Sequence, residues 1–235
     1  MKRLSILLLL TLTLTSLSRA SDFFSTERSE NLFTFGARIG VNTSNRTVSS
    51  QSDYGYNVQG WGTGFDLGVV ADLNIRDFIS LQPGFFFESR SNTYTFIQAI
   101  PISGNEEYHS AQAGTFNSYS LVIPILANIH FNLTDDVRWN VEVGPYFAIN
   151  LGSKLNNKVN LNTNYLEGRP LAGNEFRARP AGGDFGLKFG TGIELFSRYT
   201  VNIDYMAGMR HAWKNDLTNY GGRTKAWTFT IGYNF

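Results

Sequence analysis

The carboxy-terminal stretch Trp227-Thr228-Phe229-Thr230-Ile231-Gly232-Tyr233-Asn234-Phe235 alternates large apolar residues with small or polar ones at every position. Successive side chains of a β-strand point to opposite faces of the sheet. One face of this stretch is therefore apolar and aromatic, and the other is small and polar. A transmembrane barrel turns the apolar face to lipid, whereas a soluble sheet buries it. The rest of the chain has to distinguish the two.

The same alternation recurs in seven further segments, each close to the ~9–11 residues that a tilted strand needs to cross a bilayer. With the carboxy-terminal stretch, the predicted strands are 33–41, 65–75, 79–87, 119–131, 139–149, 185–195, 201–209 and 227–235. This pattern predicts an all-β fold, namely an eight-stranded antiparallel up-and-down transmembrane β-barrel.

Charged residues occupy only the polar phase of these segments. Placing Arg or Lys against lipid near the bilayer midplane costs ~2–4 kcal/mol, so this placement favours a membrane barrel over a soluble sandwich or a lipocalin-like cup. We expect the charges to form a structural network that fills a lumen as narrow as eight strands allow; the alternative is a narrow ion path. The ten residues are Arg38, Asp66, Asp72, Glu88, Arg90, Glu142, Lys188, Glu194, Asp204 and Arg210.

The links between the predicted strands alternate between short and long. Short links lie at 76–77, 133–136 and 197–199, and long ones at 43–60, 91–115, 152–183 and 214–225. Outer-membrane barrels have short periplasmic turns and long extracellular loops. The pattern therefore predicts that both termini are periplasmic and that four loops face the exterior.

The amino-terminus has the features of a secretory signal peptide. Lys2 and Arg3 precede an apolar run that is too short to span a membrane, and small residues flank a cleavage position after Ala20. We expect residues 1–20 to be a signal peptide, 21–30 a periplasmic segment and 31–235 the barrel.

Composition excludes several classes of function. Without Lys2, Arg3 and Arg19, 17 of the 20 basic residues remain against 19 acidic ones, so the net charge is −2 and no nucleic-acid partner is indicated. The absence of cysteine excludes a lipoprotein anchor, disulfides and thiolate metal sites.

Three prolines, Pro83, Pro124 and Pro145, interrupt predicted strands. Proline cannot donate to a ladder and is normally found at edges or bulges. A closed barrel has no edges, so we expect bulges at these three positions.

Five segments of the chain together carry a resemblance to a known family: Phe35–Asn42, Phe78–Gly84, Ile123–Leu126, Gly144–Tyr146 and Gly232–Phe235. They resemble the PorT-like outer-membrane β-barrel domain family of Bacteroidota-type bacteria. The resemblance covers nearly the whole chain after residue 20 and implies a small barrel in the outer membrane of a Gram-negative bacterium. Most members of the family have no assigned function, and one branch is associated with type IX protein secretion.

Residues that could carry catalysis are few and scattered. His109 is expected in the second outer loop, His130 near the periplasmic end of a strand, and His211 at an outer strand end without a neighbouring serine. The run 106–109 lacks the spacing of a metal site, and Gly190-Thr191-Gly192 lies mid-strand and is no phosphate loop. We therefore predict no catalytic, metal or cofactor residues.

These observations leave three hypotheses of different classes. The first is a non-enzymatic barrel with a closed lumen that presents extracellular loops or docks an envelope assembly, including a secretion-related one. The second is narrow-pore transport, and the third is a lipid-modifying enzyme. The partners expected for the first are outer-membrane lipid, the barrel-assembly machinery and other envelope proteins.

Tyr233 and Phe235 are the predicted assembly signal, because by resemblance the barrel-assembly machinery recognises a last strand with an aromatic end. We expect the mature protein to start at Ser21 and Phe235→Asp to reduce the inserted fraction sharply. Immunoblots of outer-membrane fractions measure this fraction. Undiminished membrane levels of the variant would show that this end carries no such signal.

Overall fold

The computed structural model describes residues 23–46, 55–101, 107–162, 179–211, 213–214 and 223–235, so the predicted signal peptide lies outside the described residues. Within these ranges, no helix is long and apolar enough to span a membrane. The strands are β1 (Phe33–Arg46), β2 (Gly55–Arg76), β3 (Ile79–Pro101), β4 (Glu107–Thr134), β5 (Val137–Asn162), β6 (Arg179–Pro180), β7 (Gly183–Leu195), β8 (Tyr199–Gly208), β9 (Trp213–Lys214) and β10 (Thr224–Asn234).

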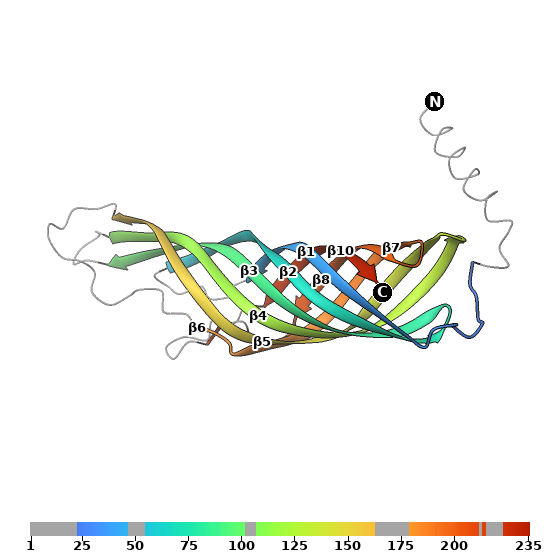
Figure 1. Cartoon of the computed structure of the whole chain (residues 1–235). Coiled ribbons are helices and arrows are strands. Elements are labelled where there is room, and N and C mark those ends of the chain that lie inside the picture. Colours follow the sequence, from blue (N-terminus) through green and yellow to red (C-terminus); the bar gives the residue numbers. More distant parts are fainter. Residues whose placement is uncertain (1–22, 47–54, 102–106, 163–178, 212, 215–222) are drawn as a thin grey trace, which may run out of the picture.

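Eight of these strands form one closed antiparallel barrel, in the order β1-β10-β8-β7-β5-β4-β3-β2 (Figure 1). The barrel closes between the first and last long strands, where β1 and β10 pair from Gly36↔Asn234 to Arg46↔Thr224. The short strands β6 and β9 form a separate two-stranded sheet. The predicted all-β, eight-stranded up-and-down barrel is confirmed.

The two faces of each strand differ as the alternation predicts. In β10, for example, Ile231 is 60% exposed whereas its neighbour Thr230 is 6% exposed. The apolar residues of the other seven barrel strands likewise lie on the outer surface, and small, polar and charged residues lie inside. The short links at Asp77–Phe78, Asp135–Asp136 and 196–198 are also as predicted.

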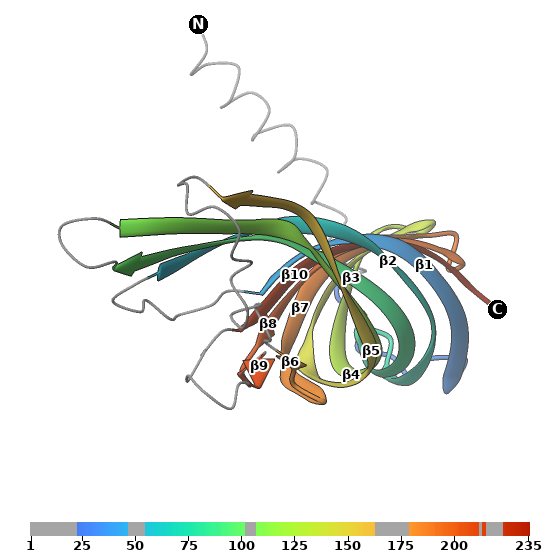
Figure 2. The same cartoon turned by 90° about the vertical axis from the view of Figure 1, so that its left-hand side faces the viewer.

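Four strands are much longer than predicted. β2, β3, β4 and β5 have 22, 23, 28 and 26 residues, and Figures 1 and 2 show them continuing past the closed barrel as an open sheet. We call the parts beyond the barrel the extension. Its segments are Gly55–Trp61 of β2, Asn92–Pro101 of β3, Glu107–Tyr119 of β4 and Asn150–Asn162 of β5.

The extension corrects the predicted long loops. Most of 91–115 is strand, and His109, predicted in a loop, pairs with Ala99 in the β3–β4 ladder. Parts of 43–60 and 152–183 are strand as well. The apolar phase ends at the membrane boundary, but backbone pairing does not depend on an apolar face and therefore continues.

A bulge in β2 marks the start of the extension. The register between β2 and β3 shifts between Trp61 and Phe65. Two side chains of β1 reach across the resulting gap to β3. Asn42 Nδ2 donates to Ser89 O at 2.9 Å, and Ser44 Oγ donates to Ser91 O at 2.9 Å. Their path is open because β2 carries glycine opposite both of them, at Gly64↔Asn42 and Gly62↔Ser44.

The expected bulges at the three prolines are wrong. The β3–β4 register is the same on both sides of Pro83, the β4–β5 register on both sides of Pro124, and the β5–β7 register runs through Pro145 without a break. The ladder instead loses rungs, since Gly84 and Phe85 have no partner on β4. A missing proline donor is thus accommodated by omitted hydrogen bonds, with no inserted residue.

The segment that precedes β1 packs on the short turns, at the end of the barrel that we call the turn end. The amide of Asp77 donates to Glu27 O at 3.0 Å, and the amide of Asn132 donates to Phe23 O at 3.1 Å. The Phe24 and Phe78 rings lie 4.3 Å apart. The segment thereby ties the β2–β3 turn to the β4–β5 hairpin.

Gly64→Ala should destabilise the barrel, because the new methyl group would overlap the main-chain oxygen of Ser89 and crowd the Asn42 amide. We expect a cost of about 1–3 kcal/mol, as for other overpacked sites. Gly152→Ala is the matched control, since its methyl group would meet no atom within 4 Å. Urea titration of refolded protein in lipid vesicles measures both, and equal stabilities would contradict the proposed crossing of β2 by β1 side chains.

Candidate functional site

The structure brings most of the predicted charged residues together inside the lumen. Buried there are Arg38, Asp66, Asp72, Glu88, Arg90, Glu142, Lys188 and Asp204, and the Glu194 side chain is 13% exposed. Arg210 corrects the prediction, because β8 ends at Gly208 and the Arg210 side chain is exposed. The apolar phase continues past Gly208 to Met209, so the sequence could not show where the strand stops.

Two ion pairs lie in the lumen. Arg90 donates through Nε to Glu88 Oε2 at 2.8 Å and also binds that oxygen through Nη2. Lys188 Nζ lies 3.2 Å from Asp204 Oδ2 and 5.3 Å from the centre of the Phe86 ring. Both pairs are almost completely buried, so each charge depends on its partner.

Amide side chains bind the remaining buried carboxylates. Asn42 donates to Asp66 at 3.0 Å and Gln82 to Asp72 at 2.8 Å, and Asn202 Nδ2 lies 3.4 Å from Glu142 Oε2. In each of these contacts, the amide and the carboxylate lie on different strands. The charge pattern of the sequence did not identify them.

At the turn end of the barrel, Asn234 links β1 to β7. Arg38 Nη2 donates to Asn234 Oδ1 at 2.9 Å, and Asn234 Nδ2 donates to Glu194 Oε2 at 3.1 Å. Arg138, which the sequence analysis missed, binds Asp77 at 2.6 Å and lies 3.9 Å from Glu194. The last strand thus helps to close the lumen with its side chains as well as its backbone.

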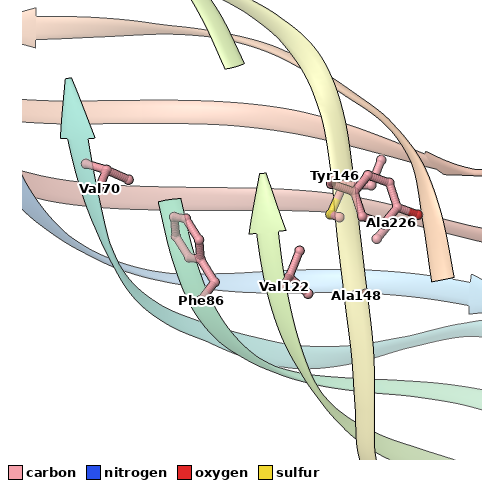
Figure 3. Packing of buried hydrophobic residues seen from close by; sticks show 7 residues of the cluster. Val70, Phe86, Val122, Tyr146, Ala148 and Ala226 are labelled. Atoms are coloured by element: carbon pink, nitrogen blue, oxygen red, sulfur yellow. The ribbon is translucent and has the colours of Figure 1, made fainter. Parts of the chain in front are cut away.

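The lumen also contains a cluster of buried apolar side chains, which Figure 3 shows. Tyr146 and Met206 are fully buried, and Arg90 Nη2 lies 3.1 Å from the Met206 sulfur. Cavities occur toward both ends of the barrel, with about 590 Å³ at the turn end and about 20 Å³ at the opposite end. The cluster consists of Val70, Phe86, Val122, Tyr146, Ala148, Met206 and Ala226.

Two further ionisable residues, Arg46 and Asp184, lie near the end of the lumen opposite the turn end. Arg46 donates to Ser118 Oγ at 2.6 Å and lies over the Phe116 ring, and Asp184 accepts a hydrogen bond from the Tyr146 hydroxyl at 3.0 Å. Sequence reasoning missed both because they fall just outside the predicted strands 33–41 and 185–195. The signal that could have found them is the strand period of two, since Arg46 shares the inward phase of Arg38, and Asp184 shares that of Lys188.

A serine of β3 and a histidine of β4 meet near the turn end of the barrel. Ser80 Oγ lies 3.0 Å from His130 Nε2 and 3.4 Å from Asp72 Oδ1. In a hydrolase triad the acid orients the imidazole, but here it binds the serine. Ser80 is also 1% exposed. We assign a chain in which His130 donates to Ser80 and Ser80 donates to Asp72, which is a structural arrangement.

Among the described side chains, the remaining histidine is His211. The exposed His211 lies beyond the end of β8, and no group of three His, Cys, Asp or Glu residues in the described part of the chain could hold a metal ion.

Comparison with known proteins identifies the family. A model described as "Outer membrane protein beta-barrel domain" matches residues 20–213. The chain therefore belongs to the outer membrane protein β-barrel domain family, and its localisation is the outer membrane of a Gram-negative bacterium. None of the curated proteins compared with the chain matches it.

Several solved structures resemble the chain at low identity. Neisserial surface protein A has 12% identity over 86% of this chain and 97% of its own, with a TM-score of 0.43. OprG from Pseudomonas aeruginosa has 9% identity over 90% and 99%, with a TM-score of 0.43. The attachment invasion locus protein Ail of Yersinia pestis, in complex with sucrose octasulfate, has 12% identity over 86% and 99%, with a TM-score of 0.38.

Lys188→Met should destabilise the barrel by about 3–5 kcal/mol, because it leaves the buried Asp204 carboxylate without its cation. A second substitution, Asp204→Leu, should recover much of this loss because it removes the buried carboxylate that has no counter-ion. Leu67→Val, on the lipid face, is the control and should be nearly silent. Heat-modifiability on gels ranks the variants. A silent Lys188→Met together with a severe Leu67→Val would mean that the faces are inverted.

Proposed function

We propose that this outer-membrane barrel is non-enzymatic and non-conducting, and that it presents its extension outside the cell or uses it to dock another envelope protein. The observation that carries the proposal is the combination of a filled lumen with an extension built on four of the eight strands. A barrel adapted to transport would need a passage, whereas this chain places paired ions and a fully buried tyrosine and methionine there.

The orientation supports an external extension. The three short turns lie at the end opposite the extension, together with the segment that precedes β1. Short turns of outer-membrane barrels are periplasmic. The extension therefore projects to the outside of the cell. Extracellular partners, or external parts of an envelope assembly, are accessible on that side.

The resemblance to the PorT-like family supports one finer version of this proposal, in which the docked assembly belongs to a protein-secretion system. Its other partners would be outer-membrane lipid around the barrel and the barrel-assembly machinery during insertion. Narrow-pore transport is the second candidate, favoured only by the charges in the lumen. A lipid-modifying enzyme is the third, favoured only by the Ser80–His130 contact.

An epitope tag inserted between Pro101 and Glu107, at the tip of the extension, should be accessible to antibody on intact cells. The same protein in planar bilayers should show no large steady conductance, because its side chains fill the eight-stranded lumen. A tag between Asp135 and Asp136, in a periplasmic turn, is the control and should be inaccessible.

Stable openings of porin size would favour transport instead. Loss of acyl chains from outer-membrane lipids in cells that express the protein, abolished by Ser80→Ala, would favour an enzyme.

A further inference from the structure

Two buried amide oxygens face the same point of the lumen, beside Gly192 of β7. Asn140 of β5 and Asn202 of β8 flank this glycine in the barrel ladder. The position that a Cβ atom of Gly192 would take lies 2.1 Å from Asn202 Oδ1 and 2.7 Å from Asn140 Oδ1. Both side chains are buried, and neither oxygen has a hydrogen-bond partner among the described residues. Leaving a buried acceptor unpaired is costly, so a donor or a cation is needed between them.

A carboxylate orients the Asn202 amide. Asn202 Nδ2 lies 3.4 Å from Glu142 Oε2, and an ionised carboxylate can only accept a hydrogen bond. The amide nitrogen therefore faces Glu142, and the amide oxygen faces Gly192.

Two carboxylates beside these amides share one lysine. Lys188 Nζ lies 3.2 Å from Asp204 Oδ2, whereas Asp204 Oδ1 faces Gly190 and has no hydrogen-bond partner among the described residues. Glu142 lies within hydrogen-bond reach of Asp204. Arg38, the other base near Glu142, interacts more strongly with Asp72. One negative charge of the Glu142–Asp204 pair is therefore left without a cation, and an uncompensated charge is expensive in a buried place.

The possible occupants differ in which of these two requirements they meet. A proton on Glu142 would balance the charge but would leave both amide oxygens without a donor. A water molecule would donate to the amide oxygens but would leave the charge. A cation of single charge meets both requirements, because it binds amide and carboxylate oxygens together. Hard cations prefer such all-oxygen sites.

We propose that an alkali-metal cation binds in the lumen between Asn140 and Asn202, with Glu142 and Asp204 as its counter-charges. The ion would tie β5 to β8 across β7. A single charge also fits the rest of the site, since the described residues contain no group of three His, Cys, Asp or Glu residues that could hold a metal ion. The inference does not depend on the proposed function.

The first test compares salts. The full-length protein, refolded from urea into lipid vesicles, should be more stable in sodium chloride than in choline chloride at the same ionic strength. Choline is too large for a site between packed side chains, so it reproduces the ionic strength alone. A ligand raises the folding equilibrium constant by one plus the ratio of its free concentration to its dissociation constant. We expect a rise of at least about tenfold, which corresponds to roughly ten times the dissociation constant, with potassium chloride as the second probe. Urea titrations measure it.

Three variants locate the ion. Asn140→Leu removes one amide oxygen, and Glu142→Gln removes the excess negative charge, so each should abolish the difference between the salts. Gln82→Leu is the matched control, because Gln82 is a lumen amide that donates to Asp72 at 2.8 Å and does not border Gly192. This control should lose stability but keep the ratio between sodium and choline. Heat-modifiability on gels establishes that each variant has folded.

Equal stability of the wild type in sodium, potassium and choline chloride would overturn the inference. It would mean that water, a proton or a direct contact between the two amides satisfies the site. A salt difference that persists in folded Asn140→Leu or Glu142→Gln would overturn it as well, because the ion would then bind elsewhere. The tag and conductance measurements test the proposed function independently.

Discussion

The hydrogen-bonded closure between β1 and β10 is the constraint on which the rest of the structure depends. The bilayer core offers no water, so every backbone amide and carbonyl needs a partner within the protein. Eight strands satisfy this requirement only by closing on themselves. The closed barrel then leaves an interior wide enough for side chains alone, and it places every second residue against lipid. Both the filled lumen and the apolar exterior follow from this closure.

Inside the lumen, the positions of large side chains determine where glycine is needed on the neighbouring strand. Gly190 lies opposite Asp204 and Gly192 opposite Asn202, and a methyl group at either glycine would overlap the facing side chain. The sequence predicted which charges face inward because that depends only on the period of two. It did not predict their partners, or the Ser80–His130 contact, because these depend on which strands are neighbours and on register and distance.

The membrane-spanning part of the fold was predictable because its two faces meet different solvents. Beyond the bilayer both faces meet water or other protein, so the alternation of apolar and polar residues no longer marks the strand. In Asn92-Thr93-Tyr94-Thr95-Phe96 the aromatic residues Tyr94 and Phe96 fall on the opposite phase from Phe85 and Phe87. The membrane pattern therefore breaks in this segment, and the extension was predicted as loop. The prolines were misjudged for a related reason, since a sequence cannot show whether a missing donor leads to a bulge or to an omitted hydrogen bond.

The bulge in β2 connects the lumen to the extension. At this point β2 loses its hydrogen bonds to β3, and the β1 side chains of Asn42 and Ser44 supply donors to the freed carbonyls. Asn42 also donates to Asp66 in the lumen. The polar interior thus stabilises the irregularity at which β2 leaves β1, and the start of the extension depends on side chains buried in the lumen.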